Sequence, residues 1–114
     1  MDENMAKTVD QQIEDILREH PNAECFDGED GETFVFDKPA RPVIARFNAG
    51  IMGGKPQGAA ENILRDTRLF PDKEALEAFI RESPGAVGTL ANEVMKLAGG
   101  DKKFSPRRRG VTGS

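Results

Sequence analysis

A glycine-rich turn that ends in a lysine, Gly53-Gly54-Lys55, is the first segment whose residue types could do chemistry. The backbone N–H groups of such a turn can hold a phosphate when a helix follows. The phosphate-loop pattern, however, requires a glycine where Ala49 stands and a serine or threonine where Pro56 stands. We therefore interpret the segment as a loop between two helices.

A dense acidic run lies between Asp27 and Glu32, and carboxylates at such spacing could ligate calcium. An EF-hand pattern that starts at Asp27 needs an Asp or Asn where Gly31 stands and a Glu where Lys38 stands. The sequence fails at both positions. The acidic run is therefore interpreted as the solvated turn of a β-hairpin, and no metal site is predicted.

The only histidine, His20, and the only cysteine, Cys25, could in principle form a nucleophilic pair. The simpler interpretation places Cys25 on a strand and His20 at the end of a helix, where a cation interacts favourably with the helix dipole. Ser83 is interpreted as a helix cap, and Ser105 and Ser114 lie in the C-terminal tail, outside any nucleophile motif. We therefore predict no catalytic residue, no metal ligand and no cofactor, which argues against an enzyme.

Charge is distributed unevenly along the 114 residues. Residues 1–40 carry 12 acidic and 3 basic groups, residues 41–100 carry 7 and 8, and residues 101–114 carry 1 and 5, which together give the net charge of −4. The basic tail could follow phosphates, but only Phe104 there could stack on a base, so nucleic acid is not expected as a partner. The sequence has no apolar run of membrane-spanning length and no secretory signal, which predicts a soluble, intracellular protein.

Hydrophobic spacing predicts an amphipathic helix near the N-terminus. The apolar residues of 9–17 recur at helical intervals, Thr8 with Gln11 matches a capping box, and Pro21 ends the helix after His20.

A β-hairpin and further helices are predicted downstream. Residues 23–27 and 32–37 flank an Asp-Gly turn and predict a hairpin, which must pack on helices or gain a strand from elsewhere. Four helices are expected to follow, one starting at Pro42, one over residues 57–70, one capped by Asp72 and one starting at Ser83-Pro84.

These elements predict an α+β fold that is mainly helical, with an N-terminal helix and one β-hairpin followed by a C-terminal helical half. We expect residues 1–8 to be a flexible N-terminus, residues 9–100 a single α+β domain and residues 101–114 a disordered basic tail. Apolar residues of the C-terminal helices are candidates for the core or for a partner-binding groove, and the sequence leaves both roles open. They are Ile63, Leu64, Phe70, Leu76, Phe79 and Ile80.

The stretch from Phe34 to Phe47 runs from a hydrophobic strand through Lys38-Pro39 into a helix with a basic–aromatic pair, Arg46-Phe47. Residues 69–76, with a Pro-Asp break, and residues 83–100, with a Pro-Gly start, continue the pattern. Across about residues 13–100, the chain resembles small tail assembly chaperones of long-tailed bacteriophages and prophages.

This resemblance implies a non-enzymatic role in the cytoplasm of a bacterial host cell. Proteins of this kind coat the helical tape-measure protein and keep it soluble until the tail-tube protein polymerises around it. Such a role requires an apolar groove and self-association as a homo-oligomer, and it involves no membrane. The alternative is a small prophage-encoded regulatory or nucleic-acid-binding protein that acts through its basic C-terminal tail.

Overall fold

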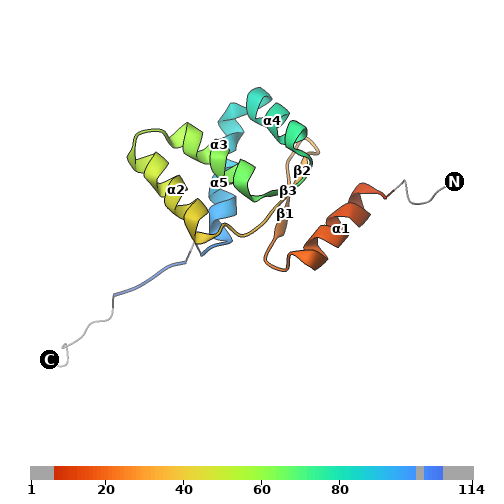
Figure 1. Ribbon diagram of the computed structural model, residues 1–114, viewed down its shortest axis with the longest axis horizontal. Helices are drawn as coiled ribbons and strands as arrows, with labels where there is room; N and C mark the ends of the chain where they lie inside the picture. The colour runs from red at the N-terminus through yellow and green to blue at the C-terminus, as the bar shows by residue number, and fades with distance from the viewer. Residues whose placement is uncertain (1–6, 100–101, 107–114) are drawn as a thin grey trace.

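The computed structural model describes residues 7–99 and 102–106. Within them, five helices and a three-stranded antiparallel sheet of order β1-β2-β3 form an α+β, mainly helical fold (Figure 1), which confirms the predicted fold class. The elements in chain order are α1 (Val9–Glu19), β1 (Glu24–Asp27), β2 (Thr33–Phe36), α2 (Arg41–Met52), α3 (Pro56–Thr67), β3 (Arg68–Phe70), α4 (Lys73–Glu82) and α5 (Pro84–Lys96).

Helix α1 begins at the predicted capping box. The Gln11 backbone N–H donates to the Thr8 hydroxyl, and the Thr8 backbone N–H donates to the Gln11 side chain, both at 3.1 Å. No residue of α1 is fully buried. The helix lies on the side of the sheet away from α3, α4 and α5 (Figure 1). At its other end, His20 Nδ1 is 3.4 Å from a carboxylate oxygen of Asp37, in the chain that follows β2.

The hairpin gains a third strand from residues 68–70, which were predicted to be helical. The helix predicted over residues 57–70 ends at Thr67, and residues 68–70 pair with β2, so that boundary was wrong. Two features, one local and one from a distant part of the chain, end α3 there. Pro71 disfavours helical backbone at Phe70, and the Asp37 N–H donates to the Thr67 carbonyl at 2.8 Å.

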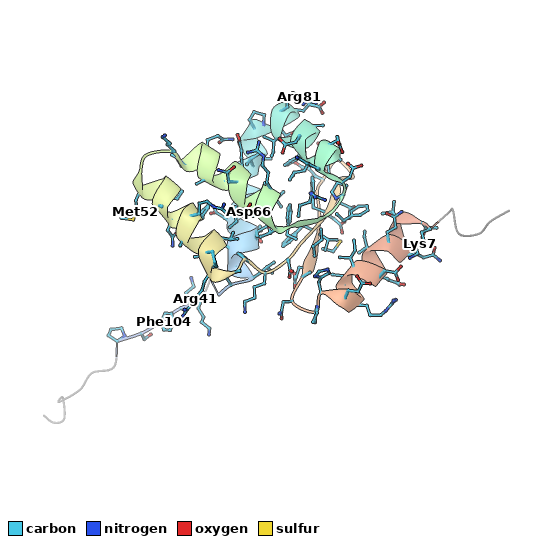
Figure 2. The ribbon with its side chains drawn as sticks, in the orientation of Figure 1. Lys7, Arg41, Met52, Asp66, Arg81 and Phe104 are labelled. Atoms are coloured by element: carbon cyan, nitrogen blue, oxygen red, sulfur yellow. The ribbon has the colours of Figure 1, made fainter. Side chains whose placement is uncertain are left out.

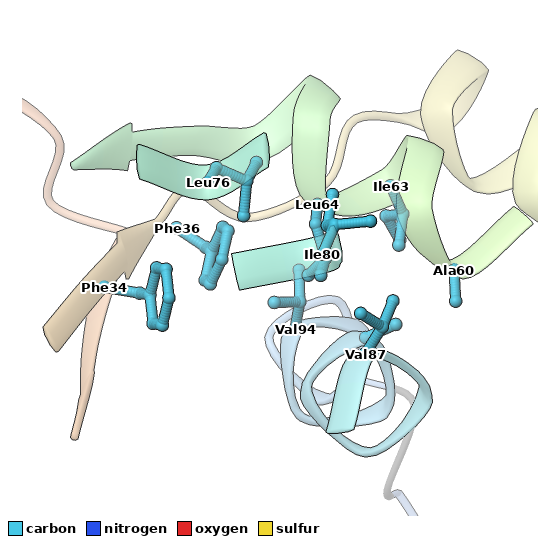
Figure 3. Close-up of a cluster of buried hydrophobic side chains, with 10 residues drawn as sticks. Phe34, Phe36, Ala60, Ile63, Leu64, Leu76, Ile80, Val87 and Val94 are labelled. Atoms are coloured by element: carbon cyan, nitrogen blue, oxygen red, sulfur yellow. The ribbon is translucent and has the colours of Figure 1, made fainter. Parts of the chain in front are cut away.

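The two faces of the sheet differ because side chains alternate along β2. Phe34 and Phe36 point into a core formed with α3, α4 and α5 (Figure 3). Val35, between them, is also fully buried but lies on the opposite face, where it pairs with Cys25 of β1 and Phe70 of β3. The buried core cluster consists of Phe34, Phe36, Ala60, Ile63, Leu64, Leu76, Ile80, Val87, Ala91 and Val94.

The two ends of the chain were predicted to be flexible or disordered. Residues 102–106 are exposed and have no regular secondary structure. The disorder predicted for the rest of 101–114, and the flexibility predicted for residues 1–6, concern segments outside the described residues. No helix in the described part of the chain is long and apolar enough to span a membrane.

A two-pronged ion pair joins α3 to α4 and makes one prediction about acid stability. Arg65 donates from Nε and from a terminal nitrogen to the two carboxylate oxygens of Glu77, at 2.7 and 3.0 Å. This hydrogen bonding holds the pKa of the Glu77 carboxyl below its usual value. A depressed carboxyl pKa stabilises the fold above the unfolded-state pKa of about 4.3 and ceases to do so as pH falls through the folded-state value.

We expect Glu77→Gln to lower the thermal midpoint slightly at pH 7, because the pair is solvent-exposed and contributes modestly. This loss should shrink as the pH falls below about 4.3 and the Glu77 carboxyl becomes protonated. Thermal unfolding followed by far-UV circular dichroism at several pH values measures this difference. Glu14→Gln, at an exposed position of α1, is the matched control and should show no such pH-dependent difference. An equal effect of both variants at every pH would contradict the assignment.

Candidate docking groove

A groove runs between the β1–β2 turn and the corner where α4 meets α5. Its larger part, with a volume of about 510 Å³, is lined by the hairpin turn and the adjoining ends of β1 and β2, by the α4–α5 corner, and by α5 from Ala86 to Glu93. Its smaller part, of about 350 Å³, extends along α4 to Pro71. The two parts adjoin because both are lined by Glu32, Phe34, Phe79 and Ser83. These volumes are typical of ligand-binding clefts.

The floor of the groove is aromatic. The rings of Phe34 and Phe79 meet edge to face with centroids 4.9 Å apart, and Phe34 stacks on Phe36 at 5.7 Å. Phe26, half-buried, extends this surface along β1, and its ring centroid lies 6.0 Å from that of Phe36. Ala86 and Leu90 continue the apolar lining on α5. The floor therefore offers a continuous apolar surface anchored directly on the core.

The rim of the groove is acidic. Six carboxylates line its two parts, and no lysine or arginine is among the lining residues. Glu93 pairs with Lys96 at 3.0 Å, and within the described residues no other rim carboxylate has an ion-pair partner. The six are Asp27, Glu29, Asp30, Glu32, Glu82 and Glu93. Around an apolar floor, such a rim favours an occupant that combines apolar and positively charged groups.

The hairpin turn that carries most of the rim is held in place by its own hydrogen bonds. The Gly31 N–H donates to the Gly28 carbonyl at 3.2 Å, and the Gly28 N–H donates to the Glu32 carbonyl at 2.8 Å. Gly31 adopts a φ of 91°, which favours glycine. The Glu32 carboxylate accepts from the Asp30 N–H at 3.2 Å, so Glu29 and Asp30 project from a fixed turn.

The opposite wall depends on the packing of α4 and α5. Asp72 caps α4 as predicted, accepting from the Ala75 N–H at 2.9 Å. Ser83 occupies the junction between the two helices, where its N–H donates to the Phe79 carbonyl at 2.8 Å. Ser83 is the N-cap residue of α5, as predicted, and its hydroxyl makes no capping hydrogen bond. The corner brings Phe79 of α4 and Ala86 of α5 into the lining of the same groove.

Of the six apolar residues that the sequence offered for core or groove, four belong to the core. Ile63, Leu64, Leu76 and Ile80 are at most 7% exposed and pack in the core cluster. Phe79 lines both parts of the groove. Phe70 is half-buried and pairs with Val35, so it lies on the sheet face that α1 covers. The structure thus assigns a groove position to Phe79 alone among the six.

His20 and Cys25, the possible nucleophilic pair, have different surroundings in the structure. His20 faces Asp37, whereas Cys25 is exposed on β1. Desolvation, together with the carboxylates of Asp27 and Asp10, raises the pKa of the Cys25 thiol, which makes it less nucleophilic at neutral pH. Within residues 7–99 and 102–106, no group of three or more His, Cys, Asp or Glu side chains could hold a metal ion.

The fold and the groove together define a small, mainly helical α+β domain with an acidic-rimmed groove. The chain belongs to the DUF6848 family, a domain of unknown function, whose model matches residues 22–107. Its structure is similar to that of an uncharacterised protein, rbstp2171, from Bacillus stearothermophilus, with a TM-score of 0.72 and 20% identity over 83% of this chain and 99% of that one. No curated protein matches the sequence. The family match contains the whole groove and leaves α1 outside it.

Proposed function

We propose that this chain is a non-enzymatic tail assembly chaperone of the type found in long-tailed phages and prophages. Its client would be the helical tape-measure protein, kept soluble in the bacterial cytoplasm until tail-tube protein assembles around it. The observation that carries the proposal is the groove, whose aromatic floor and acidic rim suit the apolar face of an amphipathic helix flanked by basic residues. The sequence resemblance over residues 13–100 supports the same role.

The groove also accounts for how the chain could discriminate between helices of different charge. An apolar floor alone would accept any hydrophobic helix, whereas the rim carboxylates, five of which have no ion-pair partner among the described residues, disfavour helices with acidic flanks. Phe34 and Phe79 are held by the core, so the floor is already formed when a partner arrives. Preorganisation of this kind reduces the ordering cost of binding.

Co-expression with a tape-measure protein tests the proposal. The unmodified chain is expected to raise the soluble yield of that protein several-fold. Ala86→Lys places a positive charge in the groove at an exposed position of α5, so it should remove the gain without unfolding the domain. Asn92→Lys adds the same charge to the same helix outside the groove lining and is the matched control.

Two results would contradict the proposal. A tape-measure protein that is equally soluble with and without this chain would exclude the chaperone role. Equal loss of activity in Ala86→Lys and Asn92→Lys would exclude the groove as the binding site. Salt-sensitive binding of duplex DNA that depends on residues 101–114 would instead favour the alternative, a regulatory or nucleic-acid-binding protein that acts through its basic tail.

A further inference from the structure

The chain carries, at its C-terminal end, a segment whose chemistry matches its own groove. Residues 102–109 contain five basic side chains and one phenylalanine: Lys102, Lys103, Phe104, Arg107, Arg108 and Arg109. Phe104, labelled in Figure 2, is 86% exposed. Lys102 and Lys103 are also exposed. The three arginines lie outside the described residues and add three positive charges to the segment.

We infer that the acidic groove of one copy binds the basic, phenylalanine-containing tail of a second copy. The aromatic floor formed by Phe26, Phe34 and Phe79 would take Phe104, and the rim carboxylates would pair with the lysines and arginines around it. Five of the rim carboxylates have no ion-pair partner among the described residues, so a basic segment satisfies charges that the fold leaves unpaired. This inference does not depend on the proposed chaperone function.

The course of the tail favours a second copy over the chain's own groove. The groove lies beside the hairpin turn and extends along α5 as far as Glu93, whereas the tail follows the C-terminal end of α5 and runs away from the body (Figure 1). Gly99 adopts a φ of 88°, and the Lys102 N–H donates to the Gly99 carbonyl at 3.0 Å. To enter its own groove, the chain would have to reverse its direction at this point.

A tail that binds a neighbour's groove makes a heterologous contact, in which two different surfaces of the same chain meet. Such a contact repeats from copy to copy and generates rows or rings rather than closed two-fold dimers. It also places the tail in competition with any other basic, apolar segment for the same site. A client helix would then have to displace the tail before it could bind.

Sedimentation analysis of full-length variants tests the inference, with interference optics because the chain has no tryptophan or tyrosine. The tail variant carries Lys102→Ser, Lys103→Ser and Phe104→Ser. The groove variant carries Glu29→Lys and Asp30→Lys, at exposed positions of the turn. Glu14→Lys with Glu19→Lys on α1 is the control, because it changes net charge equally and lies outside the groove. Circular dichroism establishes that each variant is folded.

The unmodified chain and the control are expected to exceed dimer mass as concentration rises and to dissociate at high salt, where charges are screened within about 3 Å at 1 M. Each of the other two variants should associate at least tenfold more weakly. Mixed one to one, they should form a dimer near twice 12.5 kDa and nothing larger, since only one intact tail and one intact groove can meet.

The inference is overturned if the tail variant associates as strongly as the unmodified chain, or if the mixture stays monomeric. An unmodified chain that is monomeric at every concentration also overturns it, including the case in which the tail binds its own groove. None of these results depends on a tape-measure protein. A chain that associates as described but does not solubilise that client would keep this inference and lose the proposed function.

Discussion

Phe36→Ala is expected to destabilise the domain by about 3–5 kcal/mol, because it removes a fully buried ring from the centre of the core. Phe36 contacts the rings of both Phe26 and Phe34, so the cavity would open beneath the groove floor as well as within the core. Domains of this size have a total stability of about 5–15 kcal/mol. The variant should therefore unfold at a temperature lower by roughly 15 °C or more.

Urea and thermal unfolding, followed by far-UV circular dichroism, measure this loss. Phe104→Ala, compared at a concentration where the chain is monomeric, is the matched control, because it deletes the same ring where the side chain is 86% exposed. It should change the free energy of unfolding by less than about 0.5 kcal/mol. A loss of under 1 kcal/mol in Phe36→Ala would show that the core is not organised around β2.

Local signals made the helix starts predictable from the sequence. The capping box at Thr8 and Gln11 and the cap at Asp72 depend on hydrogen bonds between residues three positions apart. Such contacts form within one turn of helix and do not depend on the rest of the fold. The hairpin was predictable for the same reason, because its turn residues Asp30 and Gly31 lie between the two strands that they connect.

The third strand could not be predicted in the same way, because its formation depends on a distant partner. Residues 68–70 are too few to show the alternation of a strand, and Phe70 continues the helical spacing of α3. Pairing with β2, more than 30 positions earlier, decides the outcome. The one local signal was Pro71, whose effect on Phe70 argues for ending the helix earlier than predicted.

The groove was only partly visible in the sequence. The acidic run at 27–32 and the apolar helix faces were both identified, but their meeting depends on packing between the hairpin turn and the α4–α5 corner. Helical spacing also shows which face is apolar without showing what covers that face. For that reason Ile63 and Leu64, which the protein itself buries, could not be separated from Phe79, which lines the groove.

The glycine-rich segment around residues 50–58 has a role in helix packing, which its comparison with a phosphate loop did not reveal. At Gly50 of α2, an added Cβ would lie 2.8 Å from the Cβ of Ala59 on α3. The short, rigid alanine side chain cannot rotate away, so the two helices would have to separate. At Gly58, by contrast, an added Cβ meets nothing within 4 Å. Two chemically identical substitutions should therefore have opposite effects.

Gly58→Ala is expected to stabilise the domain by up to about 1 kcal/mol through helix propensity. Gly50→Ala gains the same propensity, but it overpacks the α2–α3 contact at a cost of about 1–3 kcal/mol, so it should destabilise the domain. Urea unfolding measures both changes. If Gly50→Ala proved as stabilising as Gly58→Ala, the close approach of the two helices would be excluded.

A double-mutant cycle then locates the cause of the Gly50→Ala loss. In the variant with both Gly50→Ala and Ala59→Gly, the nearest atom to the new Cβ becomes the Cα of residue 59, at 3.5 Å, which is an ordinary contact. The double variant should be more stable than the sum of the single changes predicts, by about 1–2 kcal/mol. Additive single changes would mean that Gly50→Ala acts within α2 alone. A favourable coupling would mean that Gly50 is required by the close contact between α2 and α3 that it makes with Ala59.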